Sequence, residues 1–143
     1  MVTIMNDTYW DGENVLSVIK TTKKVKYYLD GYLHRKDGPA EIRFYDNGSI
    51  FIEYYYVNGL QHRDDGPAEI WYSKDKTVYL EAYKLYDKLH RKDGCAVIFH
   101  FLNKIEYWYN GKSIILENLP FELPINSEGK EFYMKLKYGD INE

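Results

Sequence analysis

The sequence predicts an all-β protein, an antiparallel β-meander built from three hairpin repeats of about 28 residues. Three observations predict this fold. A sequence motif recurs at a constant spacing, a run of alternating apolar and polar residues follows each copy, and turn signals separate the runs. The motif reads LHRKDGPA at 33–40, QHRDDGPA at 61–68 and LHRKDGCA at 89–96. A fixed period is typical of one structural unit stacked on copies of itself, so each copy buries its apolar face against its neighbours.

A forward strand is predicted directly after each copy of the motif. Residues 40–45 and 68–73 alternate with a period of two, and their β-branched and aromatic content favours a strand. Asn47-Gly48 then predicts a hairpin turn, because Asn and Gly readily take positive φ angles. In the third copy the outer face is apolar, at Val97, Phe99 and Phe101. We therefore expect that strand to be covered on both faces.

A return strand is predicted after each hairpin turn, and each one contains Glu followed by aromatic residues. These strands cover 50–57, 78–85 and 105–109, and the first ends at the turn signal Asn58-Gly59. Residues 25–31 match the same pattern, so the array begins about half a repeat before the first complete copy.

The third copy is shorter than the others. Counted from Ile98 to Glu106, it lacks three residues that the other copies have. We place this deletion at the hairpin tip around 102–104, because loops absorb length changes most easily.

The length predicts one domain, 1–143, with the repeat array at 25–112. Because terminal repeats need covers, we expect an N-terminal cap at 1–24 and a C-terminal cap at 113–143. Within the second cap, 131–138 alternates cleanly and is predicted as a strand, with a short helix as the competing assignment.

Composition and charge narrow the classes of function. The net charge is −3, which argues against nucleic-acid binding through an extended basic surface. A single cysteine, Cys95, gives neither an internal disulfide nor a cysteine cluster for metal, and it is interpreted as a small apolar filler. We find no signal-peptide pattern and no apolar run long enough to span a bilayer. The expectation is a soluble cytoplasmic protein with no cofactor, no metal and no membrane partner.

The repeat unit resembles a known family. Its pattern, Asn-Gly-x-x-His-Arg-x-Asp-Gly-Pro-Ala-x-Ile followed by a hairpin and a second Asn-Gly, is similar to a divergent MORN-type repeat over about 25–112. The chain departs from the common MORN spacing by inserting His-Arg-x-Asp-Gly-Pro-Ala. Variants of this kind occur in giant-virus, phage and antitoxin-like proteins. The resemblance implies β-hairpin units in an elongated sheet, linked to protein–protein contact and sometimes to lipid.

The repeated polar residues have two interpretations. Equivalent positions lie two strands apart, roughly 10 Å, so the three histidines cannot share one metal ion. We favour a structural clamp, in which Arg pairs with the Asp before Gly or with a return-strand Glu, and His bonds a backbone carbonyl. The alternative is a site for a phosphate-bearing ligand such as a signalling nucleotide. Its residues would be Arg35, Arg63, Arg91, His34, His62 and His90.

The surplus of aromatic side chains predicts a contact surface for a protein partner. The sequence has 16 Tyr, and neighbours along a strand face opposite sides, so they cannot all point inward. Tyr, Trp and Arg dominate interface hot spots. The candidate partner-binding residues are Trp71, Tyr54, Tyr56, Trp108, Tyr45 and Arg43. Core packing is the competing role, most strongly for Trp108. His100 is predicted to be a core histidine.

Enzyme signatures such as a P-loop, a Gly-x-Ser-x-Gly elbow or His-Glu-x-x-His do not occur in the sequence. Since the repeat architecture also accounts for the repeated polar residues, and the aromatic surplus favours contact with a protein, we predict a non-catalytic protein-binding module. The resemblance further implies a phage- or virus-encoded inhibitor, for example anti-CRISPR-like, that occludes a host protein in the host cytoplasm. The alternatives are sequestration of a phosphate-bearing ligand, an antitoxin-like partner of a toxin, and a hydrolase or transferase. Pairing of sheet edges into a homodimer stays open.

Overall fold

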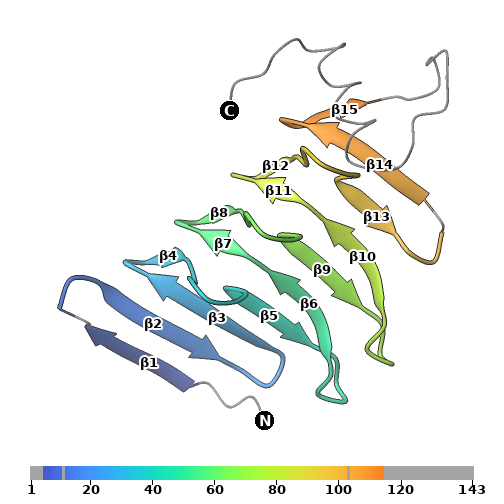
Figure 1. The fold of residues 1–143 in the computed structure, drawn as a ribbon. Coiled ribbons are helices and arrows are strands. Elements are labelled where there is room, and N and C mark those ends of the chain that lie inside the picture. Colours follow the sequence, from blue (N-terminus) through green and yellow to red (C-terminus); the bar gives the residue numbers. More distant parts are fainter. Residues whose placement is uncertain (1–4, 11, 103, 115–143) are drawn as a thin grey trace, which may run out of the picture.

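A computed structural model describes residues 5–10, 12–102 and 104–114, and these residues form an all-β protein (Figure 1). The antiparallel meander predicted from the repeats is confirmed: ten strands follow one another in chain order in one sheet, with β4 beside β3 as an eleventh. The ten are β1 (Met5–Trp10), β2 (Val15–Lys20), β3 (Lys24–Leu29), β5 (Glu41–Phe44), β6 (Ile50–Tyr54), β9 (Glu69–Tyr72), β10 (Val78–Ala82), β13 (Val97–Phe99), β14 (Lys104–Tyr109) and β15 (Lys112–Ile114). β4 covers Tyr32–Leu33.

Two small hairpins lie beside the main sheet. β7 (Tyr56–Val57) pairs with β8 (Leu60–Gln61), and β11 (Lys84–Leu85) pairs with β12 (Lys88–Leu89). The turn of the first is Asn58-Gly59, with φ angles of 49° and 82°, which is the conformation that this residue pair favours. The sequence therefore places the turn correctly.

The predicted return strands 50–57 and 78–85 are not continuous, which corrects that expectation. Each is interrupted at a tyrosine, Tyr55 or Tyr83. The backbone N–H of Tyr55 donates to the carbonyl of Ala68 at 2.8 Å instead of continuing the regular ladder. At this point the chain leaves the main sheet and enters the small hairpin.

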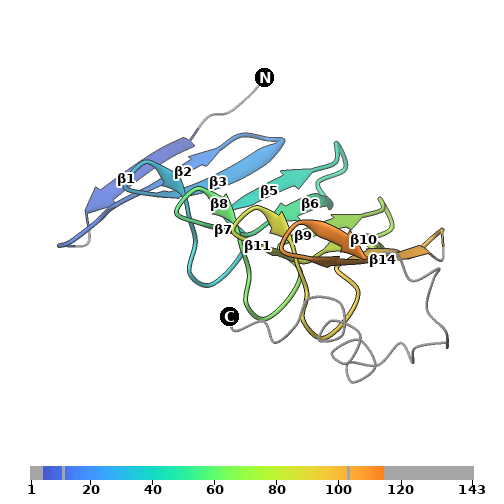
Figure 2. The same cartoon turned by 90° about the horizontal axis from the view of Figure 1, so that it is seen from above.

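The three copies of the repeated motif form loops, each of which leads to the next forward strand, β5, β9 or β13. They lie in a row along one side of the sheet (Figure 2). We name this side the loop face and the opposite side the outer face. Where each loop meets the sheet, an alanine is completely buried: Ala40, Ala68 and Ala96 are 0% exposed. Any larger side chain there would push the loop off the sheet.

The register of the third hairpin corrects the predicted deletion. Ile70 pairs with Glu81, whereas Ile98 pairs with Ile105 and not with Glu106, the residue that the sequence pattern matches to Glu81. The third hairpin is therefore four residues shorter than the second, not three. An even change keeps every side chain on its face, whereas an odd one would exchange the two faces of the strand.

The N-terminal segment extends the sheet, because β2 pairs with β3 and β1 pairs with β2. Its strands thereby cover the edge of the repeat array. The C-terminal cap, including the segment 131–138, lies outside the described residues apart from the end of β15. Within the described ranges there is no helix that is long and apolar enough to cross a membrane.

Candidate functional site: the repeated loops and the outer face

The guanidinium of each repeated arginine lies over a tyrosine ring of the loop face. The guanidinium carbon of Arg63 is 3.9 Å from the ring centroid of Tyr55, and Arg35 and Arg91 make the same contact at 4.0 and 3.8 Å. Arg63 Nη1 also donates to the carbonyl of Pro67 at 3.2 Å, and its Nε pairs with Asp65 at 3.1 Å. Of the two predicted partners, Asp or a return-strand Glu, the arginine uses the Asp.

The glycine of each loop makes room for the arginine, a role that sequence reasoning missed. A Cβ on Gly66 would lie 2.9 Å from the guanidinium carbon of Arg63, and a Cβ on Gly94 would lie 2.8 Å from that of Arg91. Real Cβ atoms do not approach other atoms so closely. The guanidinium is therefore held between an aromatic ring and a bare backbone.

Each repeated histidine joins its own repeat to the next turn of the chain. The Nδ1 atoms of His34, His62 and His90 accept backbone N–H groups of Asn58, Tyr86 and Asn110 at 3.1, 3.3 and 3.1 Å. For His62 the expectation that the ring bonds a backbone carbonyl is wrong, because Nδ1 accepts an N–H and Nε2 contacts the carboxylate of Asp64. In His62 the ring proton is left on Nε2, which donates to Asp64 at 2.9 Å, and the ring stacks on Tyr86.

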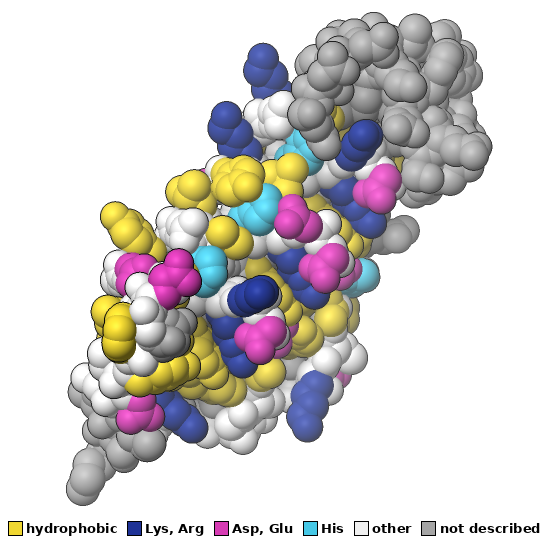
Figure 3. All heavy atoms as spheres, turned by 60° about the vertical axis from the view of Figure 1, so that its left-hand side comes forward, with side chains coloured by type: hydrophobic (Ala, Val, Ile, Leu, Met, Phe, Trp, Pro, Cys, Tyr) yellow, Lys and Arg dark blue, Asp and Glu magenta, His cyan; other side chains and the backbone are white. Residues whose placement is uncertain are grey.

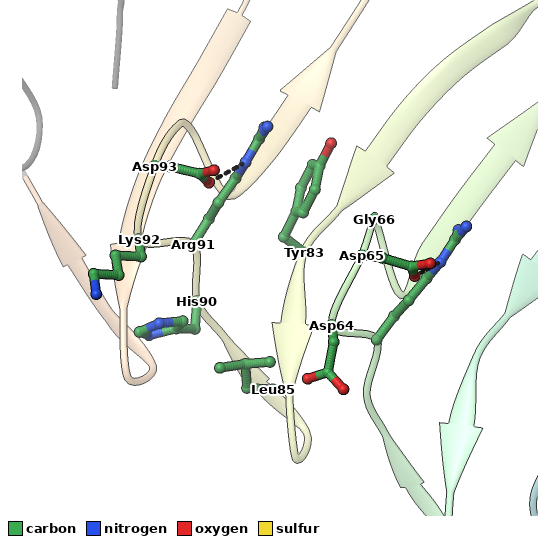
Figure 4. A pocket seen from close by; sticks show the side chains of 10 residues that line it. Asp64, Asp65, Gly66, Tyr83, Leu85, His90, Arg91, Lys92 and Asp93 are labelled. Atoms are coloured by element: carbon green, nitrogen blue, oxygen red, sulfur yellow. Dashed lines mark hydrogen bonds and ion pairs between the residues drawn. The ribbon is translucent and has the colours of Figure 1, made fainter. Parts of the chain in front are cut away.

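Polar grooves separate consecutive loops. The groove between the second and third loops has a volume of about 650 Å³, and its equivalent between the first and second loops has about 490 Å³. Figure 4 shows Arg91 beside Tyr83 in the larger groove, with Asp93 bound to the guanidinium. Basic, acidic and His side chains recur together along the row of loops (Figure 3).

The charges of these grooves balance. The larger groove is lined by three basic side chains, Arg63, Arg91 and Lys92, and by three acidic ones, Asp64, Asp65 and Asp93. A balanced lining gives little net attraction for a phosphate. In the part of the chain that the structure describes, no three His, Cys, Asp or Glu side chains are arranged to hold a metal ion.

The six candidate partner-binding residues all lie on the outer face. Arg43 and Trp71 both pair with Ile52, so the three side chains share that face, and Tyr54 follows two positions after Ile52. Trp108 reaches the same face farther along the sheet, where its indole N–H donates to Glu106 at 3.0 Å. Tyr56 lies 6.3 Å from Tyr54 between ring centroids, and Tyr45 lies 4.8 Å from Phe51.

A continuous row of rings crosses this face, and we name it the aromatic ladder. Successive ring centroids are 4.8, 5.5, 5.9 and 6.3 Å apart. The ladder consists of Tyr45, Phe51, Trp71, Tyr79 and Phe101. Phe51 and Tyr79 are not among the predicted residues. Both lie where the register shifts by a β-bulge, which breaks the strict alternation that sequence reasoning assumes.

The charged groups of the outer face are paired with one another. Glu69 accepts the indole N–H of Trp71 at 2.6 Å and the ammonium of Lys84 at 2.8 Å. Arg43 pairs with Glu41 at 2.7 Å. Beside Trp108, hydrogen bonds from Lys104 and then from the indole lower the pKa of Glu106. These pairs leave the rings as the main groups available for contact.

His100 does not occupy the core, which corrects that prediction. Its side chain is 43% exposed, and its Nε2 lies 2.8 Å from a carboxylate oxygen of Glu81. The shortened hairpin ends β13 at Phe99, so His100 already belongs to the turn. Cys95 is half-buried, and its carbonyl accepts a hydrogen bond from Arg91.

No protein-family model, curated protein or solved structure matches this chain. The similarity to MORN-type repeats therefore stays a prediction from the repeat pattern.

Proposed function

We propose that the protein is a non-catalytic protein-binding module that binds its partner through the outer face. The observation that carries this proposal is the aromatic ladder. Its five rings form one surface, and Phe101 at its end is 70% exposed. Large, rigid aromatic side chains supply contact area at low entropic cost and are enriched in interface hot spots. Because the neighbouring charges are mutually paired, the face suits a neutral, weakly polar protein surface rather than a strongly charged one.

The biological setting that we propose is inhibition by occlusion. The resemblance of the repeats to those of phage, giant-virus and antitoxin-like proteins supports an anti-defence or antitoxin-like protein, which blocks a host or toxin protein in the cytoplasm. An open sheet face acts in such a role by covering a functional surface of its partner, without any reaction of its own.

The test is a comparison of variants on the two sides of the sheet. The partner is captured from extracts of the host and identified, and its affinity for the wild-type protein is measured by calorimetry. Trp71→Ala, and the double change Tyr54→Ala with Tyr56→Ala, are expected to weaken binding by about thirtyfold or more, the range of a hot-spot residue. Lys92→Ala on the loop face is the matched control. A complex that loses affinity in the control and not in the outer-face variants overturns the proposal.

Sequestration of a phosphate-bearing ligand by Arg35, Arg63 and Arg91 is the less favoured function. Each guanidinium already has a ring, a carbonyl and a carboxylate as partners. The geometry therefore supports a structural clamp better than an open anion site.

A further inference from the structure

A third groove lies at the opposite ends of the strands from the small hairpins, between two hairpin tips. It has a volume of about 560 Å³. The β5–β6 tip and the β9–β10 tip form its two walls, and they lie side by side in Figure 1. The hydroxyl of Tyr45 ties them together by donating to the carbonyl of Tyr72 at 2.8 Å. The lining residues are Asn47, Gly48, Ser49, Ile50, Tyr72, Lys74 and Lys76.

This tip groove differs in charge from the two grooves of the loop face. Its lining has two lysines and no acidic residue. Among the residues that the structure describes, neither ammonium forms an ion pair, because the nearby carboxylates have other partners. Asp46 pairs with Lys23 at 3.4 Å, and Asp75 accepts the hydroxyl and the backbone N–H of Thr77. The lining of the groove is therefore positive, while the carboxylates of Asp46 and Asp75 lie outside it.

The backbone at Lys76 is a second, independent observation. Lys76 has a φ of 72°, in the left-handed region, whereas the first hairpin has Gly48 at the same position with a φ of 84°. A residue with a side chain is strained there, and Gly is not. Strained non-glycine residues cluster at functional sites. The lysine is thus held in the lining at a cost in stability that glycine would avoid.

The groove also adjoins the aromatic ladder. The ammonium of Lys74 lies 5.7 Å from the ring centroid of Tyr45, the first ring of the ladder. On the other wall, the side-chain oxygen of Asn47 accepts from the backbone and hydroxyl of Ser49. The side-chain amide of Asn47 is left as a hydrogen-bond donor at the groove.

We propose that the tip groove binds a phosphate monoester that carries a ring or another flat apolar group. Two ammonium groups match the charge of a phosphate monoester, which is about −1.5 to −2 at neutral pH, better than they match a single carboxylate. Lysine binds phosphate as a point charge, and the Asn47 amide adds a directed donor. The apolar group would lie against Tyr72, whose side chain lines the groove. This site is separate from the outer-face contact and does not depend on it.

The test uses phenyl phosphate as the probe, followed by nuclear magnetic resonance of the backbone amides. Saturable shifts are expected at 47–50 and 72–76, with inorganic phosphate weaker because it has no ring and benzoate weaker because it has one charge. The double variant Lys74→Gln with Lys76→Gln is expected to bind about tenfold more weakly. The amides of the loop face report that this variant remains folded. Lys88→Gln with Lys92→Gln is the matched control and should bind as the wild type does.

Three results would each overturn the proposal. The first is the absence of saturable shifts with phenyl phosphate. The second is a set of shifts centred on the loops at 62–67 and 90–95, which would place the anion on the arginine row instead. The third is equal binding by the Lys74/Lys76 variant and the wild type, which would show that the two ammonium groups do not hold the ligand.

Discussion

Arg63 lies between two flat surfaces, the ring of Tyr55 and the backbone of Gly66, and this arrangement recurs in the other two loops. A guanidinium over an aromatic ring contributes about 0.5–2 kcal/mol, depending on how far it is shielded from water. Its hydrogen bond to the carbonyl of Pro67 further fixes the loop. The repeated His-Arg-x-Asp-Gly motif is therefore explained by contacts within the fold.

The glycine of this arrangement provides a direct test. Gly66→Ala would bring a methyl group to 2.9 Å from the guanidinium carbon of Arg63. We expect the free energy of unfolding to fall by about 1 kcal/mol, because the guanidinium must shift and weaken its contacts with Tyr55, Pro67 and Asp65. Urea unfolding monitored by tyrosine and tryptophan fluorescence measures this change.

A double-mutant cycle separates the clash from any other effect of the alanine. In an Arg63→Ala background, the cost of Gly66→Ala should fall below about 0.5 kcal/mol, because the group it meets is gone. An equal cost in both backgrounds would show that the glycine has another role.

Tyr72 predicts how stability depends on alkaline pH. Burial, and then its hydrogen bond to Glu53 at 2.9 Å, raise the pKa of Tyr72 above the ordinary value of 10.0. The unfolded chain therefore loses this proton at a lower pH than the folded one. The stabilising contribution is complete below about pH 10 and is lost as the pH rises toward the folded-state pKa.

Tyr72→Phe should accordingly flatten the decline of unfolding free energy between about pH 9 and about pH 12. The decline should not vanish, because burial is the leading cause of a raised pKa at Tyr55 and Tyr83 as well. Tyr32→Phe, at a residue that is 62% exposed, is the control. Two parallel curves for wild type and Tyr72→Phe would contradict the assignment.

At the scale of the element, the hairpins show where a period of two is a sound guide and where it fails. Strict alternation places Arg43, Trp71 and Tyr54 on one face, and the structure has them there. The same rule assigns Phe51 to the wrong face, because it cannot anticipate the bulge. The same rule also does not reveal that the third hairpin is four residues shorter. Glu106 precedes aromatic residues as the Glu of the other copies does, and matching these Glu residues gives a deletion of three.

Contacts between distant segments were the least accessible from sequence. The pattern predicted that Arg, His, Asp and Gly recur for a structural reason. It could not show that the glycine faces the guanidinium or that Nδ1 accepts an N–H from a turn 24 residues away. Such contacts depend on how the loop folds back over the sheet, and no local preference encodes that path.

The hairpin tips give a prediction of opposite sign at two equivalent positions. Lys76→Gly should stabilise the protein by about 1 kcal/mol, because glycine takes a φ of 72° without strain. Gly48→Ala should destabilise it by a similar amount, since no atom lies within 4 Å of the added methyl group and only strain remains. Thermal unfolding of the two variants measures both effects. A loss of stability in Lys76→Gly would show that the lysine side chain contributes contacts that exceed its strain.

At the scale of the whole molecule, the sheet is a linear array in which each strand bonds only to its neighbours in chain order. Stability in such arrays is a sum of nearest-neighbour contributions. Strands with partners on both sides and a loop above them should open least often.

Hydrogen exchange can check this distribution. We expect the paired amides of β6 and β9 to exchange slowest and those of the edge strand β1 to exchange much faster. Mass spectrometry of peptic fragments resolves the two regions. Uniform protection from β1 to β10 would indicate that the array opens as one cooperative unit.

The hydrogen bonds that join each repeated histidine to the next turn also determine how the repeat array could lengthen. Because each of these hydrogen bonds links a histidine only to the turn that follows, an inserted unit would remake the one bond that it interrupts and leave the others in place. Every unit gained or lost would change the span of the platform by roughly 10 Å, the width of two strands. Such a scaffold can match its reach to a target of a given size by counting units, with no redesign of its chemistry.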